Sequence, residues 1–235
     1  MEKKILVFRA GHGGRDRMNV GPNGYVEADG NLKFALYLED YFKDDKRFEV
    51  HNIRKDDSTI ALSAAPRMAA DKKADLYLSI HSDAYTSRSR GVTTFESVDL
   101  DNEDLATLIG KATAQSMGIP FRGAQERESK KHKGEDYYTD IDVAQDRGIP
   151  YVILLERGFH SNPNEERLLM DDEVVKRSAK SVAKVIKEYF YPTPVHWAEK
   201  HYESLKEKGI EINEKRFNDT VTRGEIFALL DRIVK

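Results

Sequence analysis

Residues 75–83 read Asp-Leu-Tyr-Leu-Ser-Ile-His-Ser-Asp, and this stretch decides the fold class. A short, mainly apolar run of this kind is typical of a buried β-strand. Four further runs are also rich in strand-forming residues: 4–8, 48–53, 91–96 and 151–155. Apolar residues recur with helical spacing in the stretches 30–43, 59–73, 102–117 and 172–190. Strands that alternate with helices predict an α/β fold, in which helices cover both faces of a sheet.

Polar residues with catalytic potential follow three of these predicted strands. His12 lies in Ala10-Gly11-His12-Gly13-Gly14, His81 follows the strand at 75–80, and Glu156 follows the strand at 151–155. Because ligands bind beyond strand ends in open α/β sheets, we expect these side chains to converge. With Glu27, the set offers two imidazoles and one carboxylate for zinc, and a second carboxylate that can take a proton from water. The sequence therefore predicts a zinc hydrolase.

Each of these residues also has a simpler interpretation. A single histidine after a strand is more often structural, and Glu27 could be an exposed carboxylate in the first turn of a helix. Glu156 follows five apolar residues, and a buried carboxylate is costly unless it is paired or bound to a metal. Arg157 could pair with it, although neighbours on a strand point to opposite faces.

The composition limits the kinds of partner. The chain has 235 residues, a net charge of −3 and no cysteine, so thiolate metal ligands are excluded. Basic and acidic residues are interspersed, which does not suggest nucleic acid as a partner. The apolar run that follows the first residues is too short for a signal peptide, and no stretch suggests a membrane span. We therefore expect a protein that is made in the cytoplasm and kept there unless another device releases it.

The C-terminal part differs in character from the rest. Residues 191–195, Tyr-Pro-Thr-Pro-Val, are expected to form a short stiff linker. They would separate a main domain at 1–190 from a small helical module at 196–235, with one helix near Trp197 and another near Leu229. A unit this small rarely has a sufficient core alone, so we expect it to dock on the main domain, on another copy or on a ligand.

Taken in order, the motifs of residues 1–190 resemble those of the zinc-dependent N-acetylmuramoyl-L-alanine amidases of the amidase type 3 family. The matching residues are Gly11 to Gly14, Glu27, Arg54 with Asp56, Arg67, Ala74 to His81, Gly91-Val92 and Glu156 to Asn162. The resemblance implies a mixed sheet of about six strands with helices on both faces. It also implies Zn²⁺ as the cofactor, bacterial peptidoglycan as the substrate, and cleavage of the amide between muramic acid and L-alanine.

The same resemblance assigns roles to individual residues. The zinc ligands that it implies are His12, Glu27 and His81. The catalytic carboxylate that it implies is Glu156, which would accept a proton from water. The residues that we expect to contact substrate are Gly13, Arg157 and Asn162.

The segment 122–149 departs from the family pattern. It contains Lys130-Lys131-His132-Lys133 and Tyr137-Tyr138. One interpretation is a solvated loop with a run of charges, and the composition favours it. The other is a loop that faces the substrate and grips an acidic stem peptide.

Residues 196–235 resemble one surface-layer homology motif. The matching residues are His196-Trp197-Ala198, Gly209-Ile210 and Thr222 to Glu225, while Glu214 to Phe217 replace the usual glycine-rich turn. Such motifs usually occur in threes and bind secondary wall polymers, so we expect the module to bind such a polymer or to assemble a homo-oligomer. The whole chain then suggests a phage-type endolysin, released onto the wall when the inner membrane is breached. The alternatives are a host cytoplasmic amidase of mother-cell lysis or wall recycling, a zinc carboxypeptidase-like peptidase, and a non-enzymatic wall-binding protein.

Overall fold

The structure is a computed structural model that describes residues 2–194, 196–210, 215 and 217–233. It divides into two compact units, one ending at Tyr191 and the other beginning at Pro192, and each is described by itself. Parts of the expected linker and module lie outside the described residues: 195, 211–214, 216 and 234–235.

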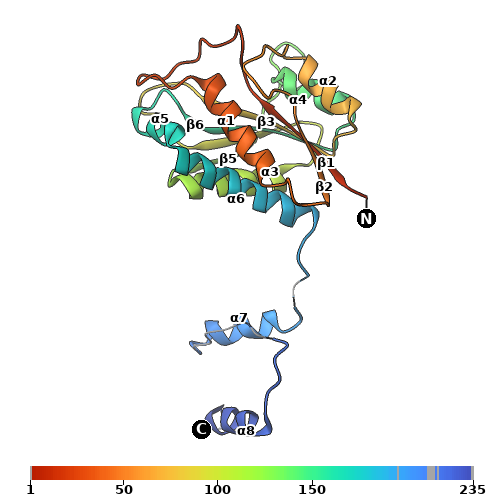
Figure 1. Cartoon of the computed structure of the whole chain (residues 1–235), viewed down its shortest axis with the longest axis vertical. Helices are drawn as coiled ribbons and strands as arrows, with labels where there is room; N and C mark the ends of the chain where they lie inside the picture. The colour runs from red at the N-terminus through yellow and green to blue at the C-terminus, as the bar shows by residue number, and fades with distance from the viewer. Residues whose placement is uncertain (1, 195, 211–214, 216, 234–235) are drawn as a thin grey trace. The chain divides into compact units, whose positions relative to one another are not determined.

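The first unit is built on one mixed sheet of six strands (Figure 1). The strands are β1 (Lys4–Ala10), β2 (Phe48–Asn52), β3 (Leu76–Asp83), β4 (Val92–Glu96), β5 (Phe121–Glu126) and β6 (Tyr151–Phe159). They lie in the order β2-β1-β3-β6-β4-β5. The first four strands in this order are parallel, β4 is antiparallel to β6, and β5 pairs parallel with β4. The predicted mixed sheet is confirmed.

Helices cover both faces of this sheet, as Figure 1 shows for α1 with α6 on one side and α2 with α4 on the other. The helices of this unit are α1 (Glu27–Asp40), α2 (Ala64–Asp71), α3 (Glu103–Met117), α4 (Thr139–Asp146), α5 (Pro163–Met170) and α6 (Asp172–Phe190). Leu78 and Leu155 join the core under α1, α3 and α6, whereas Tyr77 and Leu154 join the core under α2 and α4. Because successive strand residues point to opposite faces, both of them buried, the strands read as nearly continuous apolar runs.

The sequence does not predict three of these elements, β5, α4 and α5. The first two lie in the polar part of the chain around residues 118–148, where β5 has no fully buried residue and the apolar residues that α4 buries are only Ile141 and Ala144. Such short, half-exposed elements leave a weak hydrophobic pattern. Strand β6 also continues past its predicted end, so Glu156 lies inside the strand rather than after it.

The second unit contains α7 (Glu199–Glu207) and α8 (Arg223–Ile233), close to the two predicted helices. A capping box begins α8: the N–H of Glu225 donates to Oγ1 of Thr222 at 3.2 Å, and the N–H of Thr222 donates to Oε2 of Glu225 at 2.8 Å. The described side chains of α8 are exposed, Phe227 and Leu229 among them. Across the described part of the chain, no helix has the length and apolar character needed to cross a membrane.

Candidate functional site

Four side chains from separate parts of the chain meet at one end of the sheet. His81 on β3 and Glu156 on β6 are paired in register across neighbouring strands. His12 lies two residues beyond β1, and Glu27 is the first residue of α1. Strands β1, β3 and β6 are parallel, so their C-terminal ends lie at the same edge of the sheet. All four side chains line one cleft of about 460 Å³.

The backbone after β1 is shaped to bring the two imidazoles together. His12 has a left-handed φ of 62°, which is uncommon for a residue with a Cβ, and Gly13 follows with a φ of 121°. A Cβ added at Gly11 would lie 2.1 Å from Cε1 of His81. Glycine is therefore needed at position 11 for the ring of His81 to lie against this loop.

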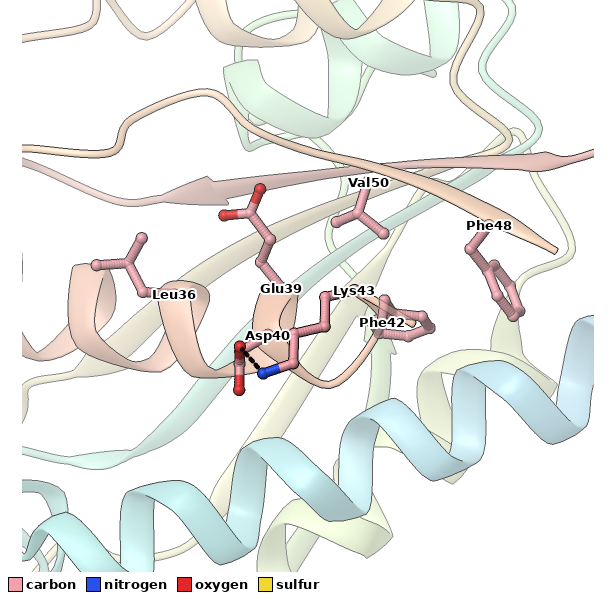
Figure 2. Close-up of a pocket in the computed structure, with 7 residues that line it drawn as sticks. All are labelled: Leu36, Glu39, Asp40, Phe42, Lys43, Phe48 and Val50. Atoms are coloured by element: carbon pink, nitrogen blue, oxygen red, sulfur yellow. Dashed lines mark hydrogen bonds and ion pairs between the residues drawn. The ribbon is translucent and has the colours of Figure 1, made fainter. Parts of the chain in front are cut away.

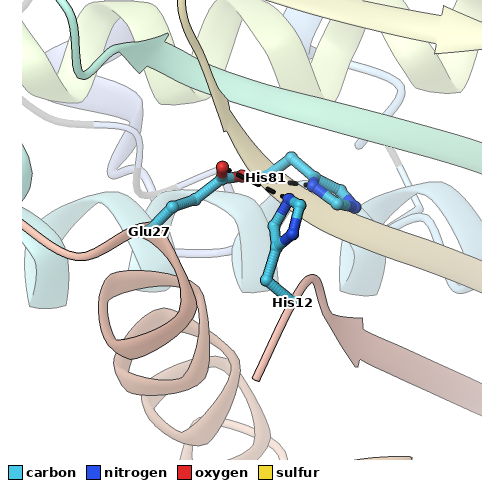
Figure 3. Close-up of side chains that lie close together, drawn as sticks. All are labelled: His12, Glu27 and His81. Atoms are coloured by element: carbon cyan, nitrogen blue, oxygen red, sulfur yellow. Dashed lines mark hydrogen bonds and ion pairs between the residues drawn. The ribbon is translucent and has the colours of Figure 1, made fainter. Parts of the chain in front are cut away.

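The side chains of His12, Glu27 and His81 point toward one another (Figure 3). Nε2 of His12 lies 3.3 Å from Oε2 of Glu27, and Nδ1 of His81 lies 3.2 Å from Oε1 of Glu27. One ligating atom of each residue lies within 4.8 Å of the others. Two imidazole nitrogens and one carboxylate oxygen are the donor set of a catalytic metal site with three protein ligands. The cluster therefore fits a single metal ion.

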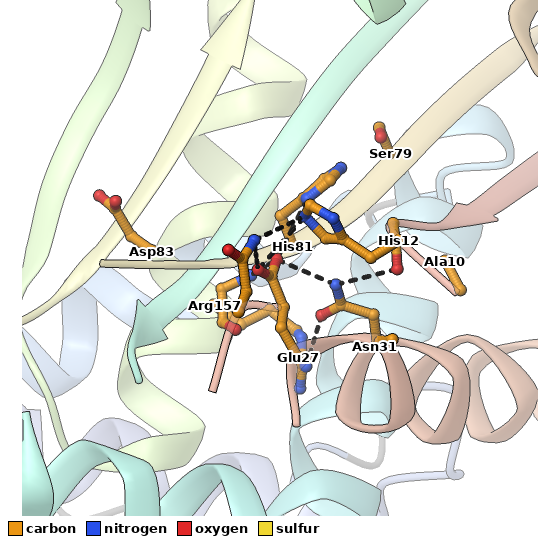
Figure 4. Close-up of polar contacts among 12 residues, drawn as sticks. Ala10, His12, Glu27, Asn31, Ser79, His81, Asp83 and Arg157 are labelled. Atoms are coloured by element: carbon orange, nitrogen blue, oxygen red, sulfur yellow. Dashed lines mark hydrogen bonds and ion pairs between the residues drawn. The ribbon is translucent and has the colours of Figure 1, made fainter. Parts of the chain in front are cut away.

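The carboxylate of Glu27 is held in place from several sides. Nδ2 of Asn19 donates to Oε2 at 2.8 Å. Nδ2 of Asn31 donates to Oε1 at 3.1 Å, and Figure 4 shows this contact. Burial alone would raise the pKa of Glu27, but hydrogen bonds from the two histidines, and then their charge, outweigh burial and hold that pKa far below its usual range. Glu27 is thus ionised at neutral pH, as a carboxylate ligand of a metal must be.

Glu156 lies in the same cleft and makes different contacts. It is 9% exposed, and among the described residues its Oε2 has no hydrogen-bond partner. Burial, followed by the nearby charges of Glu27 and Asp83, raises the pKa of Glu156 well above its usual range. A buried carboxyl group with a raised pKa and an unpartnered oxygen is suited to take up and release a proton.

Arg157 faces away from the cleft. It is 1% exposed, and its Nη2 donates to the hydroxyl of Tyr25 and to Oδ1 of Asn31, both at 3.0 Å. Its guanidinium lies 4.7 Å from the centre of the Phe34 ring on α1. Because strand neighbours point to opposite faces, Arg157 cannot share the cleft with Glu156. We therefore correct the expectation of a substrate contact: Arg157 supports Asn31, which in turn holds Glu27.

Gly13 and Asn162, also expected to contact substrate, have internal contacts as well. Gly13 is buried, and its N–H donates to the carbonyl of Asp16 at 2.9 Å. Asn162 caps α5 by accepting from the N–H of Asn164 at 2.9 Å, and its Nδ2 donates to the carbonyl of Ser89 at 2.9 Å. Neither residue is among the described residues that line the cleft.

The sequence interpretation missed residues that support the site. Asn31 could have been found, because it lies one helical turn after Glu27 and therefore on the same face of α1. Asn19 lies in an irregular segment and carries no such signal. In the segment 122–149, where composition favoured a solvated loop, Arg127, Tyr137 and Tyr138 line the cleft.

Arg54 ties the loop after β1 to α1. It is 1% exposed and donates to the carbonyls of Ala10 and Gly11, both at 3.3 Å, and of Ala28 at 2.6 Å. We expect Arg54→Met to lower the free energy of unfolding by roughly 3 kcal/mol or more, because these buried acceptors lose their donor. Urea unfolding measures the effect. Lys55→Met, which removes an exposed cation next in the chain, should change it by no more than about 0.5 kcal/mol, and equal losses in the two variants would contradict the prediction.

A second cleft, of about 450 Å³, lies between α1 and the edge strand β2 (Figure 2). Its charged side chains are already paired, Asp40 with Lys43 at 2.9 Å and Glu39 with Lys55 at 2.9 Å. Within the described residues, the one side-chain cluster that fits a metal ion is His12, Glu27 and His81, which line the first cleft. The cleft with Glu156 is therefore the candidate active site.

Comparison with known sequences gives a consistent picture. Residues 6–188 match the family model described as N-acetylmuramoyl-L-alanine amidase. The uncharacterized protein YqiI of Bacillus subtilis is 30% identical over 193 residues, which cover 81% of this chain and 86% of that protein. The N-acetylmuramoyl-L-alanine amidase AmiC of Escherichia coli is 26% identical, and the match covers 79% of this chain and 52% of AmiC. The chain thus spans about half the length of AmiC.

Solved structures show the same fold. The catalytic domain of CwlV, an N-acetylmuramoyl-L-alanine amidase from Bacillus (Paenibacillus) polymyxa var. colistinus, is similar with a TM-score of 0.70 and 30% identity. That match covers 81% of this chain and 99% of the CwlV chain. Cwp6 from Clostridium difficile is similar with a TM-score of 0.71 and 26% identity, over 79% of this chain and 29% of the Cwp6 chain.

Proposed function

The chain belongs to the N-acetylmuramoyl-L-alanine amidase family, and we propose that it uses zinc to hydrolyse the amide between N-acetylmuramic acid and L-alanine in bacterial peptidoglycan. The observation that carries this proposal is the convergence of His12, Glu27 and His81 in one cleft. The same cleft holds Glu156, whose Oε2 has no hydrogen-bond partner among the described residues. Two imidazoles and one carboxylate leave the fourth position of a tetrahedral zinc ion open for chemistry.

The residues of the cleft divide the work of hydrolysis. Zinc, when bound, supplies Lewis acidity, which polarises the amide carbonyl and makes water more acidic. Glu156 takes a proton from the attacking water and passes it to the departing nitrogen of L-alanine, so the carbonyl carbon gains a hydroxyl and the nitrogen gains a hydrogen. Asn19 and Asn31 keep Glu27 oriented as a ligand.

Digestion of purified cell walls tests the proposal. We expect new N-terminal L-alanine, its loss after treatment with a chelator, and its return when zinc is added back. New N-termini other than L-alanine would mean that the protein is a zinc hydrolase that cuts a different bond, as the carboxypeptidase-like alternative requires. If zinc binds and no termini appear from several wall types, the amidase assignment fails and a non-enzymatic wall-binding role gains support.

The biological setting of this activity stays a prediction. We propose a lytic, phage-type role for an enzyme that is made in the cytoplasm and acts on the wall after release; a host amidase of mother-cell lysis or wall recycling is the alternative. Expression inside bacteria tests the lytic role. Rapid lysis that requires permeabilisation of the inner membrane supports an enzyme released from the cytoplasm, whereas intact cells after permeabilisation contradict a lytic role.

The role of the C-terminal unit is a separate proposal. We propose that residues 196–235 bind a secondary wall polymer or join copies of the chain. Co-sedimentation of the full chain with walls, before and after the secondary polymer is extracted, tests the first function, and mass measurement in solution tests the second. Equal binding to both wall preparations by a monomeric protein would contradict both.

A further inference from the structure

One wall of the active-site cleft is formed by an arm that includes residues 127–138. Arg127, Tyr137 and Tyr138 of this arm line the same cleft as Glu156 and the proposed metal ligands. The lysines in the middle of the arm are exposed and do not line the cleft. The two ends of the arm therefore face the space that a substrate would fill, while its tip is a solvated loop.

The arm is held in a defined conformation. Its two sides are joined by the N–H of Tyr137, which donates to the carbonyl of Arg127 at 2.7 Å. Asp136 is buried and accepts from the hydroxyl of Ser97 at 2.6 Å and from the N–H of Val98 at 3.0 Å. These bonds fasten the arm to the loop that follows β4, so the position of Arg127 is set before any ligand binds.

The guanidinium of Arg127 packs against two aromatic rings. It lies 3.7 Å from the centre of the Tyr137 ring and 5.4 Å from that of Tyr138, and its Nη1 donates to the hydroxyl of Tyr138 at 3.0 Å. In the described part of the chain, Arg127 forms no ion pair with a carboxylate. A guanidinium carries five N–H donors in a rigid fork that matches a carboxylate. Most of that fork is therefore available, and its side chain is exposed.

Among the described residues that line the cleft, no second arginine or lysine is available to bind a carboxylate. Arg9 also lines the cleft, but it is buried and forms an ion pair with Asp140. The acidic side chains that line the cleft include Glu27, Asp83 and Glu156. Glu27 would be neutralised by the metal ion that it helps to bind, and the scissile amide carbonyl would occupy that ion, so Arg127 is the cation left for a carboxylate elsewhere on the ligand.

We propose that Arg127, braced by Tyr137 and Tyr138, is a specificity-determining residue that binds a carboxylate on the peptide part of the substrate. This inference rests on the proposed function, because it takes a muramoyl peptide as the ligand of the cleft. The arm would then distinguish peptides with free carboxylates from peptides whose carboxylates are converted to amides.

Binding of two small compounds tests this inference. The probes are N-acetylmuramoyl-L-alanyl-D-glutamate and the same compound with both glutamate carboxyls converted to amides. Calorimetric titration uses the full chain with Glu156→Gln, so that neither probe is consumed. We expect the acid to bind roughly tenfold more tightly than the diamide, and Arg127→Gln to remove this preference. Arg127→Lys, which keeps the charge and loses the fork, should retain part of it.

Arg122→Gln is the matched control, because Arg122 is an exposed arginine on the neighbouring strand β5 that does not line the cleft. It should keep the full preference. Equal affinities for the two probes, no binding of either, or a preference that survives Arg127→Gln would each overturn the inference. The appearance of new N-terminal L-alanine in digested walls is assayed separately with the unaltered protein. If the protein is an amidase but binds the acid and the diamide equally, this inference alone is rejected. If it prefers the acid but shows no amidase activity, the proposed function alone is rejected.

Discussion

Replacing Glu156 with glutamine is expected to lower the rate of amide hydrolysis by about 10²- to 10⁴-fold, the usual contribution of a general acid–base group. Glutamine has nearly the same shape, but it can neither take the proton from water nor give it to the leaving nitrogen. The fold should survive, because the group that is replaced is a buried carboxyl whose Oε2 has no partner among the described residues. Zinc content should also be unchanged, since the ligands that we propose are the other three residues.

The rate at which new N-terminal L-alanine appears in walls measures this effect. Metal analysis and thermal unfolding check that the variant still binds zinc and folds. Glu49→Gln is a suitable control, because it also replaces a glutamate by glutamine. Glu49 is an exposed residue of β2 that pairs with His51 at 2.8 Å and does not line the cleft. Near-full activity in the Glu156 variant would remove Glu156 from the proposed proton transfer. Loss of zinc in that variant would instead make Glu156 a ligand.

The second large effect is expected from His81→Ala. Removal of residues that merely orient a metal ligand typically costs 10- to 100-fold in metal affinity, so loss of a ligand itself should cost more than about 100-fold. Activity should then fall to background at ordinary zinc concentrations. Zinc affinity is measured by competition with a chromogenic chelator, which gives a result even when no hydrolysis is detectable.

His51→Ala provides the matched control for that experiment. His51 lies on the edge strand β2 and does not line the active-site cleft, so this variant should bind zinc as the unaltered protein does. If His81→Ala retains full zinc affinity, the assignment of the metal cluster is wrong. High zinc concentrations that restore activity to His81→Ala would show that affinity, rather than the catalytic step, had been lost.

The apolar strand pattern predicts the sheet and marks His12, His81 and Glu156. Glu27 begins a helix instead, and its role as a ligand is implied by the family resemblance. Strands buried on both faces are almost purely apolar, so a histidine or glutamate at their ends stands out against the hydrophobic pattern. Their convergence needed more than the pattern, because β3 and β6 are neighbours in space although β4, β5 and two helices lie between them in the chain. Strand order is a long-range property that residue spacing does not encode; the family resemblance implied the set of site residues but no strand order.

The supporting residues were harder to predict, because their partners are distant in sequence. Nothing near Arg157 indicates that its guanidinium bonds to Tyr25 and Asn31, far earlier in the chain, rather than facing a substrate. Arg127 lay in a segment of mixed charge whose average composition resembles that of a solvated loop. Two hydrogen bonds to the carboxylate of Asp136, and one between the backbones of Tyr137 and Arg127, hold that segment in place, and they leave no periodic signal in the sequence.

The three proposed ligands also connect folding to the supply of metal. His12, Glu27 and His81 belong to a loop, a helix and a strand that are separated along the chain, so an ion bound to all three closes two large chain loops at once. The free energy of that cross-link would add to the free energy of folding and would grow with the concentration of free zinc. In a zinc-poor compartment the amidase would therefore be both less active and easier to unfold and proteolyse, so that zinc availability would set its lifetime as well as its rate.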